Sequence, residues 1–522
     1  MRLPSPDESV AKRLCLRFAP RHFASFICPH RTGSIGIRVL STGRMMPSCS
    51  DLFDYTSGRW MYNDALRHRE RRRVFNVPEL KRLAASSIRQ KEEDVVAFEK
   101  LAEGGFNRSF LITMRDNFQF VARIPYPVIQ PKSLLIASQV ATMDFLRSHG
   151  LPVPEVYSYS ASADNRAQPE YIFMELVQGQ SLGDIWFDLS EKQRTKLIAK
   201  LVQLQSRSFA LRFPASGSIY YSSDLPGSNK VILPSSPRAD LQVEHGLYQE
   251  RLAFLNARAK KEIVYRSRFG KPLQPFARLR RDTYNYQPQS HLDYIGTLKQ
   301  YLQIATNLIP HGNSTLHCPV LRHPDLQPNN IFVSDELEIS GLIDWQHRTI
   351  LPLFLQCAIP DSLQNYGDDA ELFRKRQLHY LYVKMTSELN PEHYNALAYN
   401  FSVLRRRILH YASDPWEGDN VTLKSNLIAL SRKWVDINGG NTSPCPLMYS
   451  DTESNECLRL AHAQAEADEQ LKICQDLIGY EGATARERTL KRDALNAAET
   501  AEERTRIQEN WIFDDLCEDD YM

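Results

Sequence analysis

The sequence lacks three features that would place it in a familiar class at once. No apolar run approaches the roughly 18 to 20 residues that a helix needs to span a bilayer, so we expect no transmembrane segment. The nine cysteines are scattered and include no C-x-x-C pair, which favours free thiols over a zinc site or a disulfide framework. The formal net charge is only +2, so no overall field attracts nucleic acid.

The composition that is present is ordinary for a globular protein. Hydrophobic residues make up 42% and charged residues 24% of the chain. A chain of 522 residues is too long for one simple core and predicts about two to four structural units.

Residues 1–50 differ from the rest because they are basic and contain only Asp7 and Glu8 as acids. Serine, phenylalanine and leucine are interspersed, and no long apolar segment of a secretion signal is present. This composition is typical of a mitochondrial transit peptide, so we expect a mitochondrial protein. The alternative is a disordered basic tail without a targeting role.

Residues 51–97 predict a basic helical extension that contains the run Arg67–Arg73. Charged and apolar residues follow Pro78, which predicts that a helix begins there with proline in its first turn. A nucleic-acid patch would interleave aromatic residues with the basic ones, and the run has none. A solvated helical face is therefore the favoured interpretation, and no nucleic-acid partner is expected.

Residues 98–178 predict an antiparallel sheet with one helix. Alternating segments flank a turn at Arg115–Asn117, and further strands are expected at Val156–Tyr159 and Tyr171–Val177. Helical spacing of apolar residues covers Leu134–Arg147.

The remainder of the chain predicts mostly helices. Residues 179–445 form the expected helical part, with a capping box at Ser190–Gln193 and an insertion at about 214–320. Residues 446–522 are acidic and rich in alanine and glutamate, which predicts a tail of solvated helices.

The most informative segment is His323–Asn330, which reads H-x-D-x-x-x-x-N and is followed fourteen positions after Asn330 by Asp344. Pro324 and Pro328 prevent a regular helix, so this segment predicts a stiff loop before two short strands. Phosphoryl transfer from a nucleotide needs a carboxylate at the attacking hydroxyl, and an amide and a second carboxylate on magnesium. Asp325, Asn330 and Asp344 can fill these roles in that order, although turn-capping polar residues would give a similar pattern.

Three earlier segments could complete a nucleotide site. Gly104 and Gly105, with Phe106 and Asn107, lie between two expected strands, where glycines let backbone amides approach phosphate oxygens. Arg123 on the next hairpin could reach the same phosphates, and Glu175 to Val177 ends a strand where backbone groups could meet adenine.

The order of these segments resembles the aminoglycoside phosphotransferase and choline kinase superfamily, which has a protein-kinase-like fold. The H-G-D-L-x-P-x-N motif of that superfamily is similar to His323–Asn330. Within the superfamily, Phe120–Pro125, Val140–Leu146, Leu321–Leu326 and Ile343–His347 resemble the fungal family of altered inheritance of mitochondria protein 9. The resemblance covers roughly residues 55 to 450.

The resemblance implies an α+β fold of two lobes: an antiparallel sheet lobe with one main helix, and a mostly helical lobe. It implies ATP and Mg²⁺ as cofactors, and an unidentified small molecule whose hydroxyl accepts the γ-phosphoryl group. The roles that it implies are Asp325 as catalytic base, Asn330 and Asp344 as metal ligands, and a nucleotide-binding set of Gly104, Gly105, Phe106, Asn107, Arg123, Glu175 and Val177.

Two departures from the kinase pattern leave a second hypothesis open. Arg123 stands where a kinase has lysine, and Gln139 stands at the expected position of its glutamate partner. Arginine keeps the charge but is not equivalent to lysine, and glutamine cannot neutralise it. The alternative to a small-molecule kinase is therefore a pseudokinase that binds nucleotide or acts as a scaffold in mitochondrial maintenance.

Overall fold

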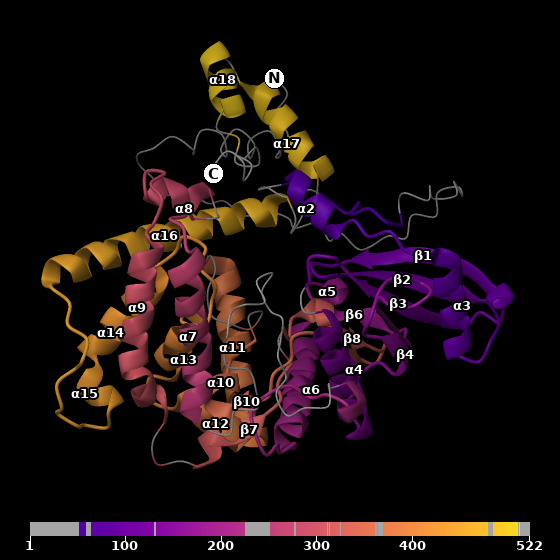
Figure 1. The fold of residues 1–522 in the computed structure, drawn as a ribbon, viewed down its shortest axis with the longest axis horizontal. Helices are drawn as coiled ribbons and strands as arrows, with labels where there is room; N and C mark the ends of the chain where they lie inside the picture. Colours follow the sequence, from indigo (N-terminus) through magenta and orange to yellow (C-terminus); the bar gives the residue numbers. More distant parts are fainter. Residues whose placement is uncertain are drawn as a thin grey trace.

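The computed structural model describes residues 52–58, 64–129, 132–224, 251–275, 278–310, 312, 314–323, 325–360, 363, 369–478, 484–498, 500–509 and 511. The expected transit peptide at residues 1–50 and part of the expected insertion lie outside these ranges. Figure 1 shows a sheet lobe on the right of the view and a larger helical lobe on the left, with α6 between them.

The N-lobe is built on a five-stranded antiparallel sheet with the order β1-β2-β3-β5-β4. Two helices accompany it, and α4 matches the expected helix at Leu134–Arg147. The bounds are β1 Val95–Glu103, β2 Asn107–Met114, β3 Gln119–Pro125, β4 Val156–Ser160, β5 Tyr171–Glu175, α3 Val77–Ser87 and α4 Lys132–Ser148, with a short turn η1 Glu92–Asp94.

Alternation along the strands divides the N-lobe into two apolar layers. Phe120 and Phe173 pack with Leu80 of α3 on one face. Val121 lies on the other face and packs with Val140 of α4. Because successive side chains of a strand point to opposite faces, Arg123 shares the face of Val121. The strand period therefore places the expected phosphate-contacting residue on the side that faces the rest of the site.

The C-lobe is mostly helical and carries two small sheets, β6-β8-β9 and β7-β10. Its strands are β6 Gln180–Ser181, β7 Pro319–Val320, β8 Ile331–Val333, β9 Ile339–Leu342 and β10 Leu351–Pro352. Its α-helices are α5 Leu182–Ile185, α6 Glu191–Ala210, α7 Arg251–Phe269, α8 Arg278–Thr283, α9 His291–Ile304, α10 Leu353–Gln356, α11 Asp369–Leu389, α12 Pro391–Ala398, α13 Ser402–Tyr411, α14 Val421–Arg432 and α15 Trp434–Ile437. Its short turns are η2 Ser222–Asp224, η3 Ala305–Leu308, η4 Ser314–His317 and η5 Pro328–Asn330.

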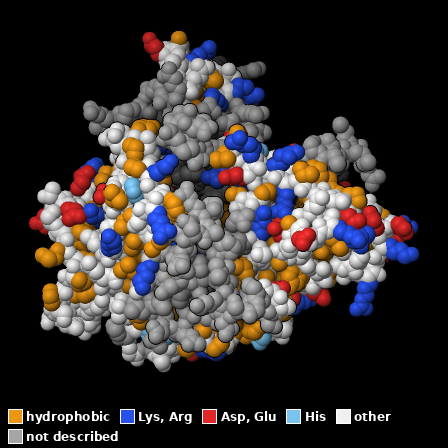
Figure 2. Space-filling view, viewed as in Figure 1, with side chains coloured by type: hydrophobic (Ala, Val, Ile, Leu, Met, Phe, Trp, Pro, Cys, Tyr) orange, Lys and Arg blue, Asp and Glu red, His pale blue; other side chains and the backbone are white. Residues whose placement is uncertain are grey.

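Two flanking parts complete the described chain. Before the N-lobe lie residues 52–58 and helix α2 Asp64–Arg71, and after the C-lobe lie α16 Asp451–Ile478, α17 Thr484–Ala497 and α18 Ala501–Glu509. The tail was expected to be solvated, but α16 packs against α8 and α14 and buries Cys457. None of the helices in the described ranges has the length and apolar character needed to cross a bilayer. Figure 2 shows side chains of both charges interspersed over the N-lobe surface in view.

The predicted α+β fold of two lobes is confirmed, because an antiparallel sheet with one long helix precedes a mostly helical lobe. The domain boundaries at residues 50, 97, 178 and 445 stay a prediction.

Candidate active site

The loop His323–Asn330 and the segment at Asp344 meet at one end of the β8–β9 hairpin. Ile331 pairs with Leu342 in the antiparallel ladder. One residue further, the Ile343 amide donates to the Asn330 carbonyl oxygen at 3.0 Å. Because the hairpin is short, Asp344 follows β9 on the same side as the loop that precedes β8.

Asp325 and Asn330 are tied directly to each other. Asn330 Nδ2 donates to the Asp325 carbonyl oxygen at 2.9 Å and to Asp325 Oδ2 at 3.2 Å, and Gln327 Nε2 donates to the same Oδ2 at 2.7 Å. Asn330 is buried and Asp325 is exposed. An amide whose nitrogen is engaged in this way turns its oxygen to the opposite side, where it can accept or bind a cation.

His323 joins the two segments through both ring nitrogens. The Asp325 amide donates to Nδ1 at 3.3 Å, so the proton resides on Nε2, which donates to the Ile343 carbonyl oxygen at 2.8 Å. The ring is 4% exposed and stands edge-on to Trp345, with centroids 4.6 Å apart. Burial lowers the pKa of His323 from 6.5 to about 3, so the ring stays neutral. His323 thus acts as a fixed link between the loop and the strand end.

Asp344 lies in a left-handed backbone conformation, with φ at 66°. Its Oδ1 accepts from Arg123 Nη2 at 2.6 Å, so the two residues form an ion pair across 221 positions of sequence. Burial raises the pKa of Asp344, but the Arg123 guanidinium outweighs it and holds that pKa below its ordinary value. The carboxylate is therefore ionised at neutral pH.

Arg123 also belongs to a polar cluster with two buried amides. With its oxygen turned to the guanidinium, Asn107 accepts from Arg123 Nε at 3.1 Å and from Nη2 at 2.8 Å. In the opposite amide orientation, Asn107 Nδ2 instead donates to Gln346 Oε1, which also accepts from Arg123 Nη2 at 3.5 Å. The sequence interpretation missed Gln346, although its position two residues after Asp344 was a usable signal.

Gln139 is not the partner of Arg123, contrary to the sequence-based expectation. The partner is Asp344, and Gln139 is 4% exposed with its Nε2 buried and without a hydrogen-bond partner. Helical spacing indicated that Gln139 could face β3. The ion pair with Arg123 is instead formed by Asp344, which is far along the chain.

The glycine hairpin, residues 103–107, lies over the segment that follows Asp344. The Gly104 amide donates to the Asn107 carbonyl oxygen at 2.9 Å, and Phe106 stands edge-on to His347 with centroids 5.0 Å apart. A Cβ added at Gly105 would meet no atom within 4 Å. The space beside the Gly105 Cα is therefore open.

The expected hinge packs against both lobes. Glu175 Oε2 accepts from Arg147 Nη1 and from the Glu155 amide, each at 3.0 Å, and the Glu175 amide donates to the Glu155 carbonyl oxygen. A Cβ added at Gly341 of β9 would lie 2.4 Å from Val177 Cγ1. Glycine at 341 therefore lets the hinge lie close to the β8–β9 hairpin, while the Glu175 carboxylate is held within the N-lobe.

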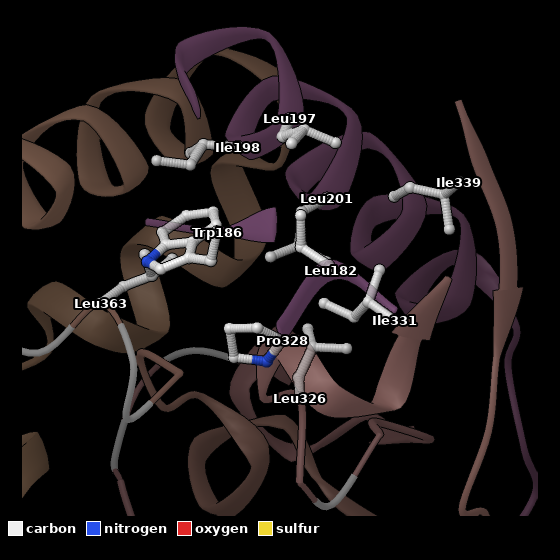
Figure 3. Close-up of a pocket in the computed structure, with 10 residues that line it drawn as sticks. All are labelled: Leu182, Trp186, Leu197, Ile198, Leu201, Leu326, Pro328, Ile331, Ile339 and Leu363. Atoms are coloured by element: carbon white, nitrogen blue, oxygen red, sulfur yellow. The ribbon is translucent and has the colours of Figure 1, made fainter. Parts of the chain in front are cut away.

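Two small cavities lie in the apolar core beneath this polar site. One, of about 20 Å³, is enclosed by apolar side chains of α5, α6 and the β8–β9 hairpin, with Leu326 and Pro328 from the loop (Figure 3). The other, of about 10 Å³, lies behind His323 and Trp345. Both are far too small for a nucleotide and are gaps in the core beneath the loop.

The chain is similar to several known proteins. Residues 97–353 match the family described as the phosphotransferase enzyme family. A subtelomeric hrmA-associated cluster protein of Aspergillus fumigatus is 28% identical over 498 residues, which cover 80% of this chain and 96% of that protein. Altered inheritance of mitochondria protein 9 of Clavispora lusitaniae is 23% identical over 497 residues, covering 77% and 82%. The crystal structure of choline kinase LicA from Streptococcus pneumoniae is 12% identical, with a TM-score of 0.34, and covers 74% of this chain and 98% of that one. The family resemblance predicted from the motifs is confirmed.

Proposed function

We propose, from the premise that residues 97–353 form a domain of the phosphotransferase enzyme family, that the protein binds Mg-ATP and phosphorylates a hydroxyl of a small molecule. The observation that carries this proposal is the junction of Asp325, Asn330 and Asp344 at one end of the β8–β9 hairpin. A chance pattern of turn-capping residues would not need the buried His323 link that holds the two segments together.

The side chains present fit a hydrated magnesium ion bound to phosphate. Asp344 and the Asn330 amide oxygen are hard oxygen donors, which Mg²⁺ prefers. Mg²⁺ usually keeps several waters and takes substrate phosphate oxygens beside one or two protein ligands, which suits a site with these two donors. When bound, the ion neutralises charge on the β- and γ-phosphate oxygens.

The remaining steps belong to the chain itself. Asp325, held by Gln327 and Asn330, orients the acceptor hydroxyl and takes its proton. The hydroxyl oxygen bonds to the γ-phosphorus, the bond from phosphorus to the bridging oxygen breaks, and ADP leaves. Arg123 can turn from Asp344 to the phosphates, and the open glycine hairpin can donate backbone amides to them.

Ligand-dependent thermal unfolding tests this proposal. Mg-ATP should raise the Tm of the wild-type protein, and Asp344→Asn should remove most of that shift. Asp335→Asn, an exposed substitution in the turn of the same hairpin, should leave the shift unchanged. Absence of a shift in the wild-type protein would exclude the nucleotide assignment.

A second candidate function is a nucleotide-binding scaffold without turnover. The 2.6 Å ion pair favours it, because the Arg123 guanidinium already supplies a positive charge at Asp344. The test is ADP formation from ATP in the presence of a metabolite extract. Formation that is lost in Asp325→Asn supports the kinase, whereas Mg-ATP binding without ADP formation supports the scaffold.

The proposed location is the mitochondrion. Relatives named as mitochondrial proteins and the basic composition of residues 1–50 support it. A fluorescent fusion of the full chain should enter mitochondria, and deletion of residues 1–50 should leave the fusion outside them.

A further inference from the structure

The basic run Arg67–Arg73 is not used by the proposed reaction, yet two of its side chains contact the sheet lobe. Arg71 Nη2 donates to the Gly105 carbonyl oxygen at 3.3 Å. Arg73 Nη1 donates to the Pro125 carbonyl oxygen at 3.2 Å, and its Nη2 pairs with Glu170. Figure 1 shows α2 beside the N-lobe sheet. The run thus contacts the backbone at the end of the β2–β3 pair that carries Asn107 and Arg123.

Glu103, directly before Gly104, is the centre of these contacts. Its Oε2 accepts from the Thr56 amide at 2.8 Å, the Ser57 amide at 2.8 Å and Ser57 Oγ at 2.7 Å. Its Oε1 lies 2.9 Å from Lys100 Nζ and 3.0 Å from Arg108 Nε. One carboxylate therefore joins residues 52–58 to both strands of the glycine hairpin.

The same two cations hold the backbone of the extension. Arg108, 2% exposed, donates from Nη1 to the Leu52 carbonyl oxygen at 3.0 Å. Lys100 Nζ donates to the Asp54 carbonyl oxygen at 3.0 Å. The guanidinium groups of Arg71 and Arg108 both lie over the ring of Tyr126, at 5.7 and 5.5 Å from its centroid. Tyr126 in turn donates its amide to the Phe106 carbonyl oxygen at 3.0 Å.

The contacts of the Glu103 carboxylate are buried, charge-assisted hydrogen bonds. The Glu103 side chain is 1% exposed, and each of its oxygens accepts from more than one donor. Burial raises the pKa of Glu103, but hydrogen bonds from Lys100, Thr56 and Ser57 outweigh it and lower that pKa below its ordinary value. Charge-assisted bonds in a poorly hydrated site fix geometry more firmly than exposed ones.

The clamped hairpin is also a part of the N-lobe that contacts the site. Asn107 contacts Arg123, and Phe106 packs on His347. Displacement of Glu103 would therefore move the groups that face a bound phosphate. A displacement of about 1 Å is enough to weaken a positioned contact.

We propose that residues 52–58 and 64–73 form a clamp on the glycine hairpin, and that Glu103 and Arg71 are positioning residues for nucleotide phosphates. The clamp lies outside residues 97–353, so the nucleotide site of this protein extends beyond its family domain. This inference rests on the proposed function for its effect on nucleotide, while the clamp itself is a property of the unliganded protein.

The first test compares affinities for Mg-ATP and adenosine by calorimetry on the full chain. Glu103→Gln and Arg71→Gln should each weaken Mg-ATP binding about tenfold and leave adenosine binding unchanged, because only the phosphates meet the hairpin. Arg71→Lys should restore most of the affinity, since an ammonium can also donate to the Gly105 carbonyl oxygen. Glu99→Gln, an exposed substitution on the same strand β1, is the matched control. Equal losses for Mg-ATP and adenosine would indicate general loosening and overturn the positioning role.

The second test needs no nucleotide. Amide hydrogen exchange across residues 103–107 should be faster in Glu103→Gln than in the wild-type protein and in Glu99→Gln. Unchanged exchange in Glu103→Gln would reject the clamp even if nucleotide binds. Failure of the wild-type protein to bind Mg-ATP would instead reject the proposed function, so the two failures are distinguishable.

Discussion

Asp344 combines an ion pair with a backbone conformation that few side chains tolerate. Its φ of 66° lies in the left-handed region, which asparagine and aspartate enter more readily than β-branched residues. Such outliers persist where the surrounding structure holds them, and here Arg123 and the β8–β9 hairpin do so.

The first prediction separates the charge of Asp344 from its conformation. Asp344→Asn should keep the fold, because asparagine accepts the same φ and still offers an oxygen to Arg123. Asp344→Val should be less stable than Asp344→Asn by about 1–3 kcal/mol, since it adds backbone strain and leaves Arg123 without a partner. Urea unfolding measures both, and equal stabilities would show that the conformation is not strained.

The second prediction concerns His323 and pH. Its pKa is about 3 in the folded protein and 6.5 in its ordinary state, so the unfolded chain binds more protons between these values. Stability should therefore fall as pH drops from 6.5 towards 3, by at most about 1.4 kcal/mol per pH unit from this group.

The comparison that isolates this effect uses His323→Gln, which cannot titrate. The loss of stability between pH 6.5 and 4 should be shallower in this variant than in the wild-type protein. His462→Gln is the control, because the His462 side chain is 78% exposed. A pH dependence of His323→Gln as steep as that of the wild-type protein would contradict the assignment.

At the residue scale, the sequence predicted contacts between residues close in the chain better than contacts between distant residues. Asp325 and Asn330 are five positions apart, so their proximity followed from the loop alone. The partner of Arg123 could not be predicted in this way, because Asp344 is 221 positions away and the pair depends on how the lobes close. Gln346 was missed although it follows Asp344 by two positions, because its contact with Arg123 also depends on how the lobes close.

At the element scale, strong periodic signals located the main pieces. The predicted helix at Leu134–Arg147 agrees with α4, Lys132–Ser148, to within two residues at each end. The strand order could not be predicted, because β3 pairs with β5 rather than with β4, its neighbour in the sequence. That choice depends on α4 crossing one face of the sheet, which is a tertiary property.

The third prediction concerns the start of α6. The predicted capping box is confirmed: Ser190 Oγ accepts from the Gln193 amide at 3.4 Å, and Gln193 Oε1 accepts from the Ser190 amide at 2.8 Å. Ser190→Ala should lower the free energy of unfolding by about 1 kcal/mol, and Ser190→Gly by only a few tenths. Chemical denaturation measures both, and a larger loss for glycine than for alanine would contradict the capping role.

At the scale of the whole molecule, the tail shows how composition can mislead. Acidic residues along 446–522 indicated solvated helices, yet the acids of α16 include a partner for a basic helix of the C-lobe. Arg280 of α8 forms two parallel bonds to Asp468, each 2.6 Å long, and a third bond to Asp419 at 3.2 Å. Tyr284 also donates to Gln464 of α16 at 2.8 Å. The acidic composition identified the tail, but it could not show which face of α16 packs against the C-lobe.

The last prediction measures how firmly this contact fastens the tail to the C-lobe. A double-mutant cycle of Arg280→Gln and Asp468→Asn should give a coupling energy of about 1–2 kcal/mol, because the pair is forked and Arg280 is only 28% exposed. The control cycle uses Arg459 and Glu456, which form a similar fork within α16 but are 63% and 56% exposed. Its coupling should be clearly smaller, because water screens the exposed charges. Both ion pairs are forked, and they differ in how far they are buried. Equal coupling energies in the two cycles would therefore show that the Arg280–Asp468 pair does not hold the tail.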